Sequence, residues 1–227
     1  FAKSIIKNYD VVHIYNWYFH IAKVFSQIAH EYKIPFVFTA NGSIQPQARA
    51  LKKNSKRIFD VLYTNKMIKQ ASILHSVGDL ETELYLKFGA KNDDVVRIDH
   101  GVNLDYFQVK NKTGILQKNN LDENQEYLLY VSRIDKKKGL EILLQGFKKI
   151  LVDYPNLILV ITGTGEMEYL EQIHKLVKNL KIENSLRFTG FVSEEEKLEL
   201  LSKAKIFTVI SHSDVHTIAA QEALAMG

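Results

Sequence analysis

Cysteine is absent from the 227 residues, and proline occurs only three times. The lack of cysteine excludes disulfides, thiolate metal sites and cysteine nucleophiles, and it is compatible with a reducing compartment. No apolar run reaches the ~20 residues that a membrane-spanning helix needs, and the opening residues lack the long apolar core of a secretory signal. The remaining composition is ordinary for a globular protein, because 46% of the residues are hydrophobic and 25% are charged. The length allows one large domain or two small ones.

The positive charge of the chain is concentrated in its first half. Up to Asp105 the sequence has 14 Lys/Arg and 10 Asp/Glu, whereas from Tyr106 onward it has 16 of each. The net charge of +4 therefore belongs entirely to the first part. We expect a charged surface partner there.

Five of these cations are spaced to share one face of a predicted helix over residues 47–70. They are Arg49, Lys52, Lys53, Lys56 and Arg57, with Leu51, Ile58 and Leu62 on the opposite face. A basic amphipathic helix is typical of contact with an anionic membrane surface or with a polyanionic acceptor. The competing interpretation is the solvated outer face of a packed helix.

Short apolar segments alternate with helical patterns throughout the chain. The predicted strands cover residues 10–15, 35–40, 72–77, 95–98, 127–131, 157–161, 186–188 and 206–210. Predicted helices lie between them, at about 18–32, 47–70, 81–88, 139–154, 166–180 and 193–204, with a last one from about 217. This alternation predicts an α/β fold with parallel sheets built from right-handed βαβ units. A polar connection over 108–125 separates an N-terminal domain, residues 1–107, from a C-terminal domain, residues 126–227.

Parallel sheets bind ligands beyond the carboxyl ends of their strands, so the turns after the strands are the places to look for chemistry. The turn after Val131 carries Arg133 and, at the start of the next helix, Lys138. Two cations near a helix N-terminus can bind a diphosphate, because the helix amides and the macrodipole add to their charge. A solvated basic turn explains the same residues equally well.

Two glycine turns follow the next two predicted strands. Gly163 and Gly165 precede Glu166, and Gly190 precedes Phe191. Glycine lets the backbone approach a ligand closely, and an apolar turn can seat a flat base. Each turn alone is a weak signal, since an ordinary helix-entry turn has the same composition.

Asp214 and Glu222 are the most informative pair. Asp214 lies in the loop after the last predicted strand, and Glu222 lies about 7 Å along a helix that starts near Thr217. Carboxylates on either side of a helix N-terminus suit a nucleotide sugar, because the amides bind the diphosphate and the carboxylates accept hydrogen bonds from the sugar and ribose hydroxyls. The alternative makes Asp214 an N-cap and Glu222 an exposed residue. Since this helix is apolar nearly all round, we expect it to be buried, and a buried Glu222 would need a partner such as the ligand.

The histidines do not predict a metal site. Only His212 and His216 have a ligand-like spacing, and no third ligand lies near them in the sequence. His13 ends the first predicted strand, where it either faces a cleft or is a buried imidazole with satisfied hydrogen bonds.

Four of these motifs, in this order, resemble the retaining GT-B glycosyltransferases of family 4, which contain the glycosyl transferases group 1 domain. The motifs are Ser132-Arg133 with Lys138-Gly139, Gly163-Thr-Gly165-Glu166, Phe188-Thr-Gly190-Phe191, and Asp214 with Glu222-Ala-Leu-Ala-Met-Gly227. In the first half, the strand-end segments 10–13, 38–42 and 97–103 look like the corresponding motifs of the family. The resemblance covers essentially the whole chain.

The resemblance implies two facing Rossmann-like domains, with the acceptor on the first, the nucleotide-sugar donor mainly on the second, and no metal or other cofactor. Arg133 and Lys138 would bind the donor diphosphate, Glu222 the ribose and Asp214 the transferred sugar, with Phe191 near the base. Asp214, Arg133 and Lys138 would be the catalytic residues. The remaining donor-site candidates are Gly163, Gly165, Glu166, Thr217 and Ile218, and the acceptor-side candidates are His13 and Asn41.

The activity implied is transfer of a hexose to an acceptor such as a lipid-linked or polysaccharide precursor, in cell-envelope polysaccharide synthesis. The expected location is the cytoplasm or the inner face of the membrane, and no nucleic acid is expected as a partner. Two alternatives stay open: a non-catalytic homologue that binds nucleotide sugars, and a GT-B epimerase of nucleotide sugars. A nicotinamide-dependent dehydrogenase is disfavoured, because the third glycine of its fingerprint is missing.

The sequence also departs from the family pattern. Asp214 stands where glutamate is usual, Val215 and Thr217 replace two glycines, and Asn41 and His100 stand where histidine and asparagine are common. The chain starts in mid-domain and stops before the elements that normally close the second domain. We therefore expect a fragment in which both domains are incomplete and which has little or no activity of its own.

Overall fold

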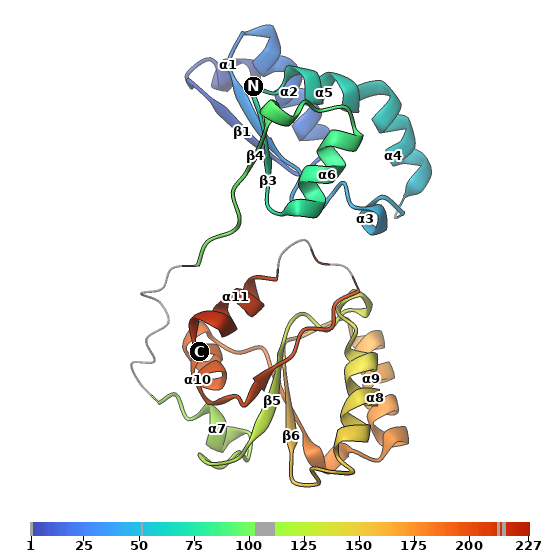
Figure 1. The fold of residues 1–227 in the computed structure, drawn as a ribbon, viewed down its shortest axis with the longest axis vertical. Coiled ribbons are helices and arrows are strands. Elements are labelled where there is room, and N and C mark those ends of the chain that lie inside the picture. The colour runs from blue at the N-terminus through green and yellow to red at the C-terminus, as the bar shows by residue number, and fades with distance from the viewer. Residues whose placement is uncertain (1, 51, 103–111, 213, 215–216) are drawn as a thin grey trace. The chain divides into compact units, whose positions relative to one another are not determined.

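The computed structural model describes residues 2–50, 52–102, 112–212, 214 and 217–227 (Figure 1). The chain forms two compact units, one of Phe1–Gly101 with Asp214–His216 and one of Val102–Ser213 with Thr217–Gly227. Each unit contains a four-stranded sheet in which every pair of neighbouring strands is parallel. The predicted α/β fold with two parallel sheets is confirmed.

The first unit has the strand order β1-β2-β3-β4. Its elements are α1 (Ala2–Ile6), β1 (Val12–Tyr15), α2 (His20–Glu31), β2 (Phe36–Thr39), α3 (Pro46–Ala50), α4 (Lys53–Phe59), a π-helical turn (Asp60–Thr64), α5 (Asn65–Gln70), β3 (Ile73–Ser76), α6 (Asp79–Lys87), a 3₁₀ turn (Asn92–Asp94) and β4 (Val95–Arg97). Each crossover moves to the next strand in the same direction. Right-handed connections therefore put α2, α5 and α6 on one face of the sheet.

The core of the first unit lies on that helix-covered face. Alternate strand residues point into it, because successive side chains of a strand face opposite sides. Phe38 and Leu74 are fully buried there together with Trp17 and Tyr85. The aromatic ring of Trp17 meets that of Phe38 edge to face at 4.6 Å between centroids. The alternate residues of the strands, His13 among them, lie on the opposite face.

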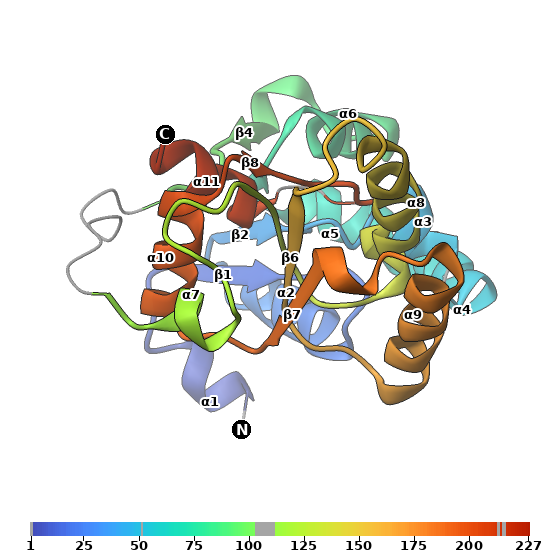
Figure 2. The ribbon, with the colours of Figure 1, turned by 90° about the horizontal axis from the view of Figure 1, so that it is seen from below.

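The second unit has the strand order β7-β6-β5-β8. Its elements are α7 (Ile115–Lys118), β5 (Tyr127–Val131), a 3₁₀ turn (Lys136–Lys138), α8 (Leu140–Ile150), β6 (Ile158–Thr162), α9 (Met167–Leu180), a 3₁₀ turn (Glu183–Ser185), β7 (Leu186–Gly190), α10 (Glu194–Lys203), β8 (Ile206–Phe207) and α11 (Ile218–Ala225). The chain moves outward from β5 to β7 and then returns past β5 to β8. This reversal places α8 and α9 on one face and α10 and α11 on the other, as Figures 1 and 2 show.

Two hydrophobic clusters reflect this division of the helices. Leu128 and Tyr130 of β5 point toward the α8 and α9 side, whereas Tyr127 and Leu129 point toward α7 and α10. The sheet is therefore buried on both faces, which explains why its strands read as nearly continuous apolar runs. The neighbouring strands β5 and β8 mark the switch point of the sheet, where the following helices leave toward opposite faces.

The predicted helix over 47–70 is interrupted, and with it the predicted basic face. α3 ends at Ala50, α4 begins at Lys53, and Lys52 between them has a left-handed backbone (φ 55°) that a continuous helix does not accommodate. Arg49 therefore lies on a different helix from Lys53, Lys56 and Arg57. The five cations do not share one helical face, and this prediction was wrong; Leu51 lies outside the described residues.

Other differences concern the segment between the domains and the last strand. Ile115, Leu116 and Leu121 belong to the region predicted as a polar connection, yet they are buried in the core of the second unit. The start of that connection, residues 108–111, lies outside the described residues, and the domain boundaries at 107 and 126 stay a prediction. β8 ends at Phe207, three residues earlier than expected. Within the described ranges, no helix is long and apolar enough to cross a membrane.

Main-chain hydrogen bonds continue beyond the strands of the second sheet and join the turns that follow them. Ile134 N donates to Thr164 O at 2.8 Å, and Gly163 N donates to Gly190 O at 2.8 Å. A Cβ atom added to Gly163 or Gly165 would collide with the carbonyl oxygen of Ser132 or Ile134. The close approach of these turns explains both glycines without a ligand.

Gly163→Ala should lower the free energy of unfolding of the second unit by about 2–3 kcal/mol, because the new methyl group meets backbone that cannot move aside. Gly146→Ala is the matched control, since nothing lies within 4 Å of an added Cβ there and the residue is inside α8. This control should gain about 0.5–1 kcal/mol. Urea denaturation followed by circular dichroism measures both, and equal effects of the two changes would contradict the packing argument.

Candidate functional site

The turns after β5 and β8 meet at the switch point of the second sheet. His212 N donates to Lys137 O at 2.8 Å. Gly139 lies so close to Ile210 that a Cβ atom added to it would collide with the Ile210 carbonyl. In open parallel sheets such a switch point forms the crevice in which ligands bind. The arrangement places the basic turn beside the loop that leads toward α11.

The basic turn has a defined backbone. Asp135 caps the 3₁₀ turn Lys136–Lys138, because its carboxylate accepts a hydrogen bond from Lys137 N at 2.9 Å. Arg133 is exposed, and its neighbours on either side are held by main-chain bonds to the turn after β6. Lys138 is half-buried and stands directly before α8. The structure thus fixes the main chain that carries Arg133 and Lys138 on one turn.

The remaining candidates of the donor site lie along the same edge of the sheet. Gly163, Gly165 and the exposed Glu166 follow β6, and Phe191 follows β7 with 83% of its surface exposed. The joined turns bring Gly163 and Gly165 next to the turn of Arg133, whereas Phe191 lies one strand further, beyond β6. Thr217 occupies the N-cap position of α11, and Ile218 at its first turn is exposed.

Glu222 has a protein partner that the sequence did not indicate. Lys197 Nζ of α10 donates to Glu222 Oε1 at 2.8 Å, and it also lies 2.8 Å from Glu194 Oε2. The side chains of Lys197 and Glu222 are only 13% and 16% exposed. Although burial opposes it, hydrogen bonds to Glu194 and Glu222 raise the pKa of Lys197. Lys197 is therefore cationic, and its ion pair with Glu222 joins α10 to α11.

The expectation that α11 is buried was wrong. None of its residues is buried, and Leu224 is 82% exposed. Only Ala223 of α11 and the following Met226 pack against the core of the second unit. Burial of the whole helix therefore does not supply the reason for Glu222 to need a ligand, because Lys197 already compensates its charge.

Asp214 is exposed and groups with the first unit, whereas Arg133, Lys138 and Glu222 belong to the second. The predicted arrangement of all four side chains around one donor stays a prediction. Val215 and His216, which entered the sequence argument, lie outside the described residues.

A chain of hydrogen bonds crosses the carboxyl ends of β1, β2 and β3 in the first unit. His13 Nε2 lies 2.7 Å from Thr39 Oγ1, which lies 2.8 Å from His75 Nδ1, and His75 Nε2 lies 2.8 Å from Ile98 O. Burial, and then the nearby His75, lower the pKa of His13. The imidazole is therefore neutral at neutral pH, with one ring nitrogen that donates a hydrogen bond and one that accepts. Of the two alternatives for His13, the structure shows an imidazole that is hydrogen-bonded and also exposed.

Asn41 lies beside this chain in the turn after β2. Its backbone is left-handed (φ 46°), and its Oδ1 lies 3.3 Å from His100 Nε2. The fully buried Glu81 holds the same turn, because its carboxylate accepts hydrogen bonds from Gly42 N at 2.8 Å and Val77 N at 3.0 Å. Burial raises the pKa of Glu81, and the two hydrogen bonds oppose that rise. Both acceptor-side candidates, His13 and Asn41, thus lie at one edge of the first sheet.

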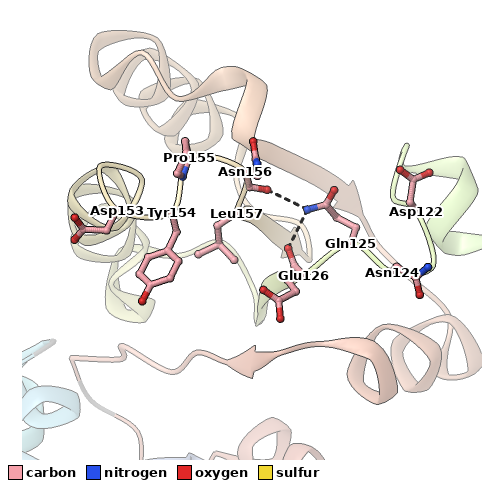
Figure 3. A pocket seen from close by; sticks show the side chains of 9 residues that line it. All are labelled: Asp122, Asn124, Gln125, Glu126, Asp153, Tyr154, Pro155, Asn156 and Leu157. Atoms are coloured by element: carbon pink, nitrogen blue, oxygen red, sulfur yellow. Dashed lines mark hydrogen bonds between the residues drawn. The ribbon is translucent and has the colours of Figure 1, made fainter.

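Two other observations bear on what these edges can hold. Within the part of the chain that the structure describes, no group of three or more His, Asp and Glu side chains is placed to bind a metal ion. A pocket of about 480 Å³ lies at the amino ends of β5 and β6, where Gln125 Nε2 donates to Asn156 O at 3.0 Å (Figure 3). Asp122, Glu126 and Asp153 line this pocket, so its charge does not suit a diphosphate, and it lies at the opposite edge from Arg133.

Comparison with known families decides the classification. The family model described as glycosyl transferases group 1 matches residues 111–227, and the model described as glycosyltransferase family 4 matches residues 1–106. The chain belongs to the glycosyl transferases group 1 family. The resemblance inferred from the sequence motifs is confirmed.

The relatives of this chain in the group 1 family are much longer than the chain itself. An uncharacterised glycosyltransferase of Methanocaldococcus jannaschii is 25% identical over 227 residues, which cover 98% of this chain and 57% of that protein. The α-monoglucosyldiacylglycerol synthase of Streptococcus pneumoniae is 25% identical over 241 residues, covering 100% and 52%. The chain spans about half the length of these relatives.

Solved structures show the same GT-B fold. The structure of Anabaena HepE in complex with UDP and glucose matches 99% of this chain and 59% of its own, with a TM-score of 0.79 and 16% identity. The sucrose-phosphate synthase of Thermosynechococcus elongatus matches 97% of this chain and 55% of its own, with a TM-score of 0.73 and 20% identity. The two parallel-sheet units of this chain therefore have the GT-B fold.

Two features of this glycosyltransferase chain were missed by the sequence argument. Thr39 and His75 are register partners on neighbouring strands, and His13 lies two residues before Tyr15, the register partner of Thr39, on the same face of β1. An alignment of the predicted strands by register could therefore have grouped them. Lys197 left no such signal, because its partner Glu222 is 25 residues away on another helix.

Lys197→Met should lower the free energy of unfolding of the second unit by about 2–4 kcal/mol, because it leaves the largely buried carboxylate of Glu222 without its ion-pair partner. Lys203→Met removes the same charge from an exposed position of α10 and should cost less than about 0.5 kcal/mol. The double variant Lys197→Met/Glu222→Gln should lose less than the sum of the single changes. Additive losses in urea denaturation would show that the ion pair contributes nothing.

Proposed function

We propose that this protein transfers a sugar from a nucleoside-diphosphate sugar to an acceptor hydroxyl, with retention of configuration and without a metal ion. The observation that carries the proposal is the switch point of the second unit, where the turn bearing Arg133 and Lys138 is bonded to the loop after β8. The UDP and glucose bound to HepE, which shares the fold, support a nucleotide-sugar donor. The names of several relatives, such as D-inositol 3-phosphate glycosyltransferase, support sugar transfer.

The donor diphosphate would lie against Arg133, Lys138 and the amides at the start of α11, at Thr217 and Ile218. Cations and helix amides together favour a phosphate group more than either does alone. The second oxygen of the Glu222 carboxylate would accept from the ribose hydroxyls while Lys197 holds the first. Asp214 would accept from the transferred sugar.

The turns after β6 and β7 would complete the donor site. The exposed ring of Phe191 offers a surface for the base, and Gly163, Gly165 and Glu166 form the adjoining edge. The packing of the turns already requires the two glycines. Beside the ligand, their lack of side chains would leave room for close approach to the main chain.

The reaction breaks the bond between the anomeric carbon and the phosphate oxygen, whose electron pair leaves with the nucleoside diphosphate. The acceptor oxygen forms the new bond to the same carbon and gives its proton to the departing phosphate oxygen. Negative charge grows on the departing diphosphate, and fixed cations lower the free energy of that state most. Arg133 and Lys138 would therefore supply what a metal ion supplies in other transferases.

We propose an acceptor of the lipid-linked or polysaccharide-precursor class, in cell-envelope synthesis, bound near His13 and Asn41. A relative named for a glycolipid product supports the lipid option. The corresponding location is the cytoplasm, with peripheral contact at the inner face of the membrane.

In the full-length protein, Lys138→Met should slow sugar release from UDP-glucose by about 100-fold, because one electrostatic contact to the developing charge is lost. Its effect on the dissociation constant of UDP-glucose should be smaller, at about 10-fold or less. Lys136→Met removes the same charge from an exposed neighbouring position and should leave both values nearly unchanged. Titration calorimetry and a coupled assay of released UDP provide the two measurements.

Glu222→Gln should weaken binding of UDP by about 10-fold, since a hydrogen bond to a charged acceptor becomes one to a neutral amide. Circular dichroism controls for folding. An unaltered UDP affinity in the folded variant would defeat the ribose assignment.

The same assays separate the competing functions. Nucleotide binding without turnover of any donor would indicate a non-catalytic homologue. Conversion of the donor into a stereoisomer, without transfer, would indicate an epimerase.

A further inference from the structure

A basic pocket lies within the first unit, between α3 and α4. Its volume is about 450 Å³, and it is lined by Pro46, Arg49, Ala50, Lys53, Lys56 and Arg57. Four of the six lining residues are cations and none is acidic. The break of the predicted helix at Lys52 creates this arrangement, because it lets Arg49 face the three cations of α4 across a hollow.

Two of the four cations are held in place by the protein. Arg49 forms a 2.6 Å ion pair with Asp60, and its guanidinium lies 4.9 Å from the ring centroid of Phe88. Lys56 Nζ donates to Ala48 O at 2.5 Å and lies 4.9 Å from the ring centroid of Tyr18. Cations fixed in this way lose little conformational entropy when an anion binds.

The surrounding sequence offers a single carboxylate to balance the charge of the pocket. Between Phe36 and Gly78 there are seven Lys/Arg and a single carboxylate, Asp60. Asp60 already accepts hydrogen bonds from Tyr18 and Thr64, at 3.0 and 2.8 Å, besides its ion pair with Arg49. Like charges around one hollow repel each other, and an anion with several oxygen acceptors, such as phosphate, relieves this repulsion.

An apolar row follows the pocket along the same helical segment. Ile58, Val61 and Leu62 are 61%, 77% and 53% exposed, and the sequence had indicated Ile58 and Leu62 on the face opposite the cations. Their spacing of i, i+3 and i+4 gathers them on one side. Val61 follows Arg57 of the pocket by four residues, so the two lie about one turn apart.

Cations beside exposed aliphatic side chains are the combination found in segments that lie at a membrane interface. A soluble phosphate ester would explain the basic pocket but not the exposed row. We propose that the basic pocket binds the phosphate of an anionic phospholipid headgroup, while Ile58, Val61 and Leu62 contact the adjoining acyl chains. The proposal rests on the peripheral location proposed above, and it holds whether or not sugar is transferred.

Co-sedimentation with phosphatidylcholine vesicles, with and without phosphatidylglycerol, tests the pocket. Lys53→Gln/Arg57→Gln should weaken binding to phosphatidylglycerol vesicles by about 30-fold, because each cation near an anionic surface contributes about 1 kcal/mol. Lys66→Gln/Lys69→Gln removes the same charge from exposed positions of α5 outside the pocket. This control pair should lose several-fold less affinity.

Val61→Asp tests the apolar row, and its high exposure makes misfolding easy to exclude by circular dichroism. Wild-type binding should keep a component that resists added salt, since the contact of aliphatic side chains is not screened. Val61→Asp should remove this component. If the folded variant kept the same salt-resistant binding, the proposed contact of Ile58, Val61 and Leu62 with the acyl chains would be wrong.

Three results would overturn the pocket or its ligand. If the pocket pair and the control pair lost the same affinity, the attraction would depend on the overall positive charge of the protein and not on the pocket. If the protein bound pure phosphatidylcholine equally well, an anionic headgroup would not be required. Binding of glycerol 3-phosphate by calorimetry, without vesicle binding, would replace the lipid by a soluble ester. Sugar release by the full-length protein, measured without vesicles, should be unchanged in Lys53→Gln/Arg57→Gln. Absent release by the full-length wild type, with vesicle binding intact, would count against the proposed function alone.

Discussion

The turns at the carboxyl edge of the second sheet are joined side by side by main-chain hydrogen bonds, and the candidate donor site depends on this join. Strands about 4.8 Å apart normally diverge once their ladder ends. Here the ladder continues through Ile134, Thr164, Gly163 and Gly190, so that three successive turns stay in contact. Arg133 and Phe191 are consequently carried by one continuous edge rather than by independent loops. Glycine is required in this edge because any side chain would force the turns apart.

The direction of the crossovers explains why the two units present different surfaces. In the first unit every crossover moves the same way, so one face carries the helices and the other carries the chain of His13, Thr39 and His75. In the second unit the chain reverses after β7, and both faces are covered. The reversal creates a switch point in the second unit, and the cations Arg133 and Lys138 lie beside it.

Charge is handled differently at the two basic regions. Near the candidate donor site, the main chain of the cationic turn is fixed by Asp135 and by the neighbouring loop. In the pocket of the first unit, the side chains of Arg49 and Lys56 are themselves held, and the only carboxylate of the surrounding segment is already engaged. Both arrangements leave positive charge that a phosphate group would neutralise. The exposed apolar groups differ, since the ring of Phe191 lies at the edge of one site and aliphatic side chains lie beside the other, which is why we propose different ligands for them.

Local pattern in the sequence was sufficient for the α/β fold, for β5 at Tyr127–Val131 and for most helices, because the periods of strands and helices depend on residues close together in the chain. The motif order from Arg133 to Glu222 was likewise sufficient for the family. Tertiary structure alone decided the partner of Glu222, the exposure of α11, the break at Lys52 and the grouping of His13 with His75. Each of these depends on which segments distant in sequence pack together, as the 25 residues between Lys197 and Glu222 illustrate. Periodicity describes only how a residue relates to its own helix or strand, so it carries no information about such partners.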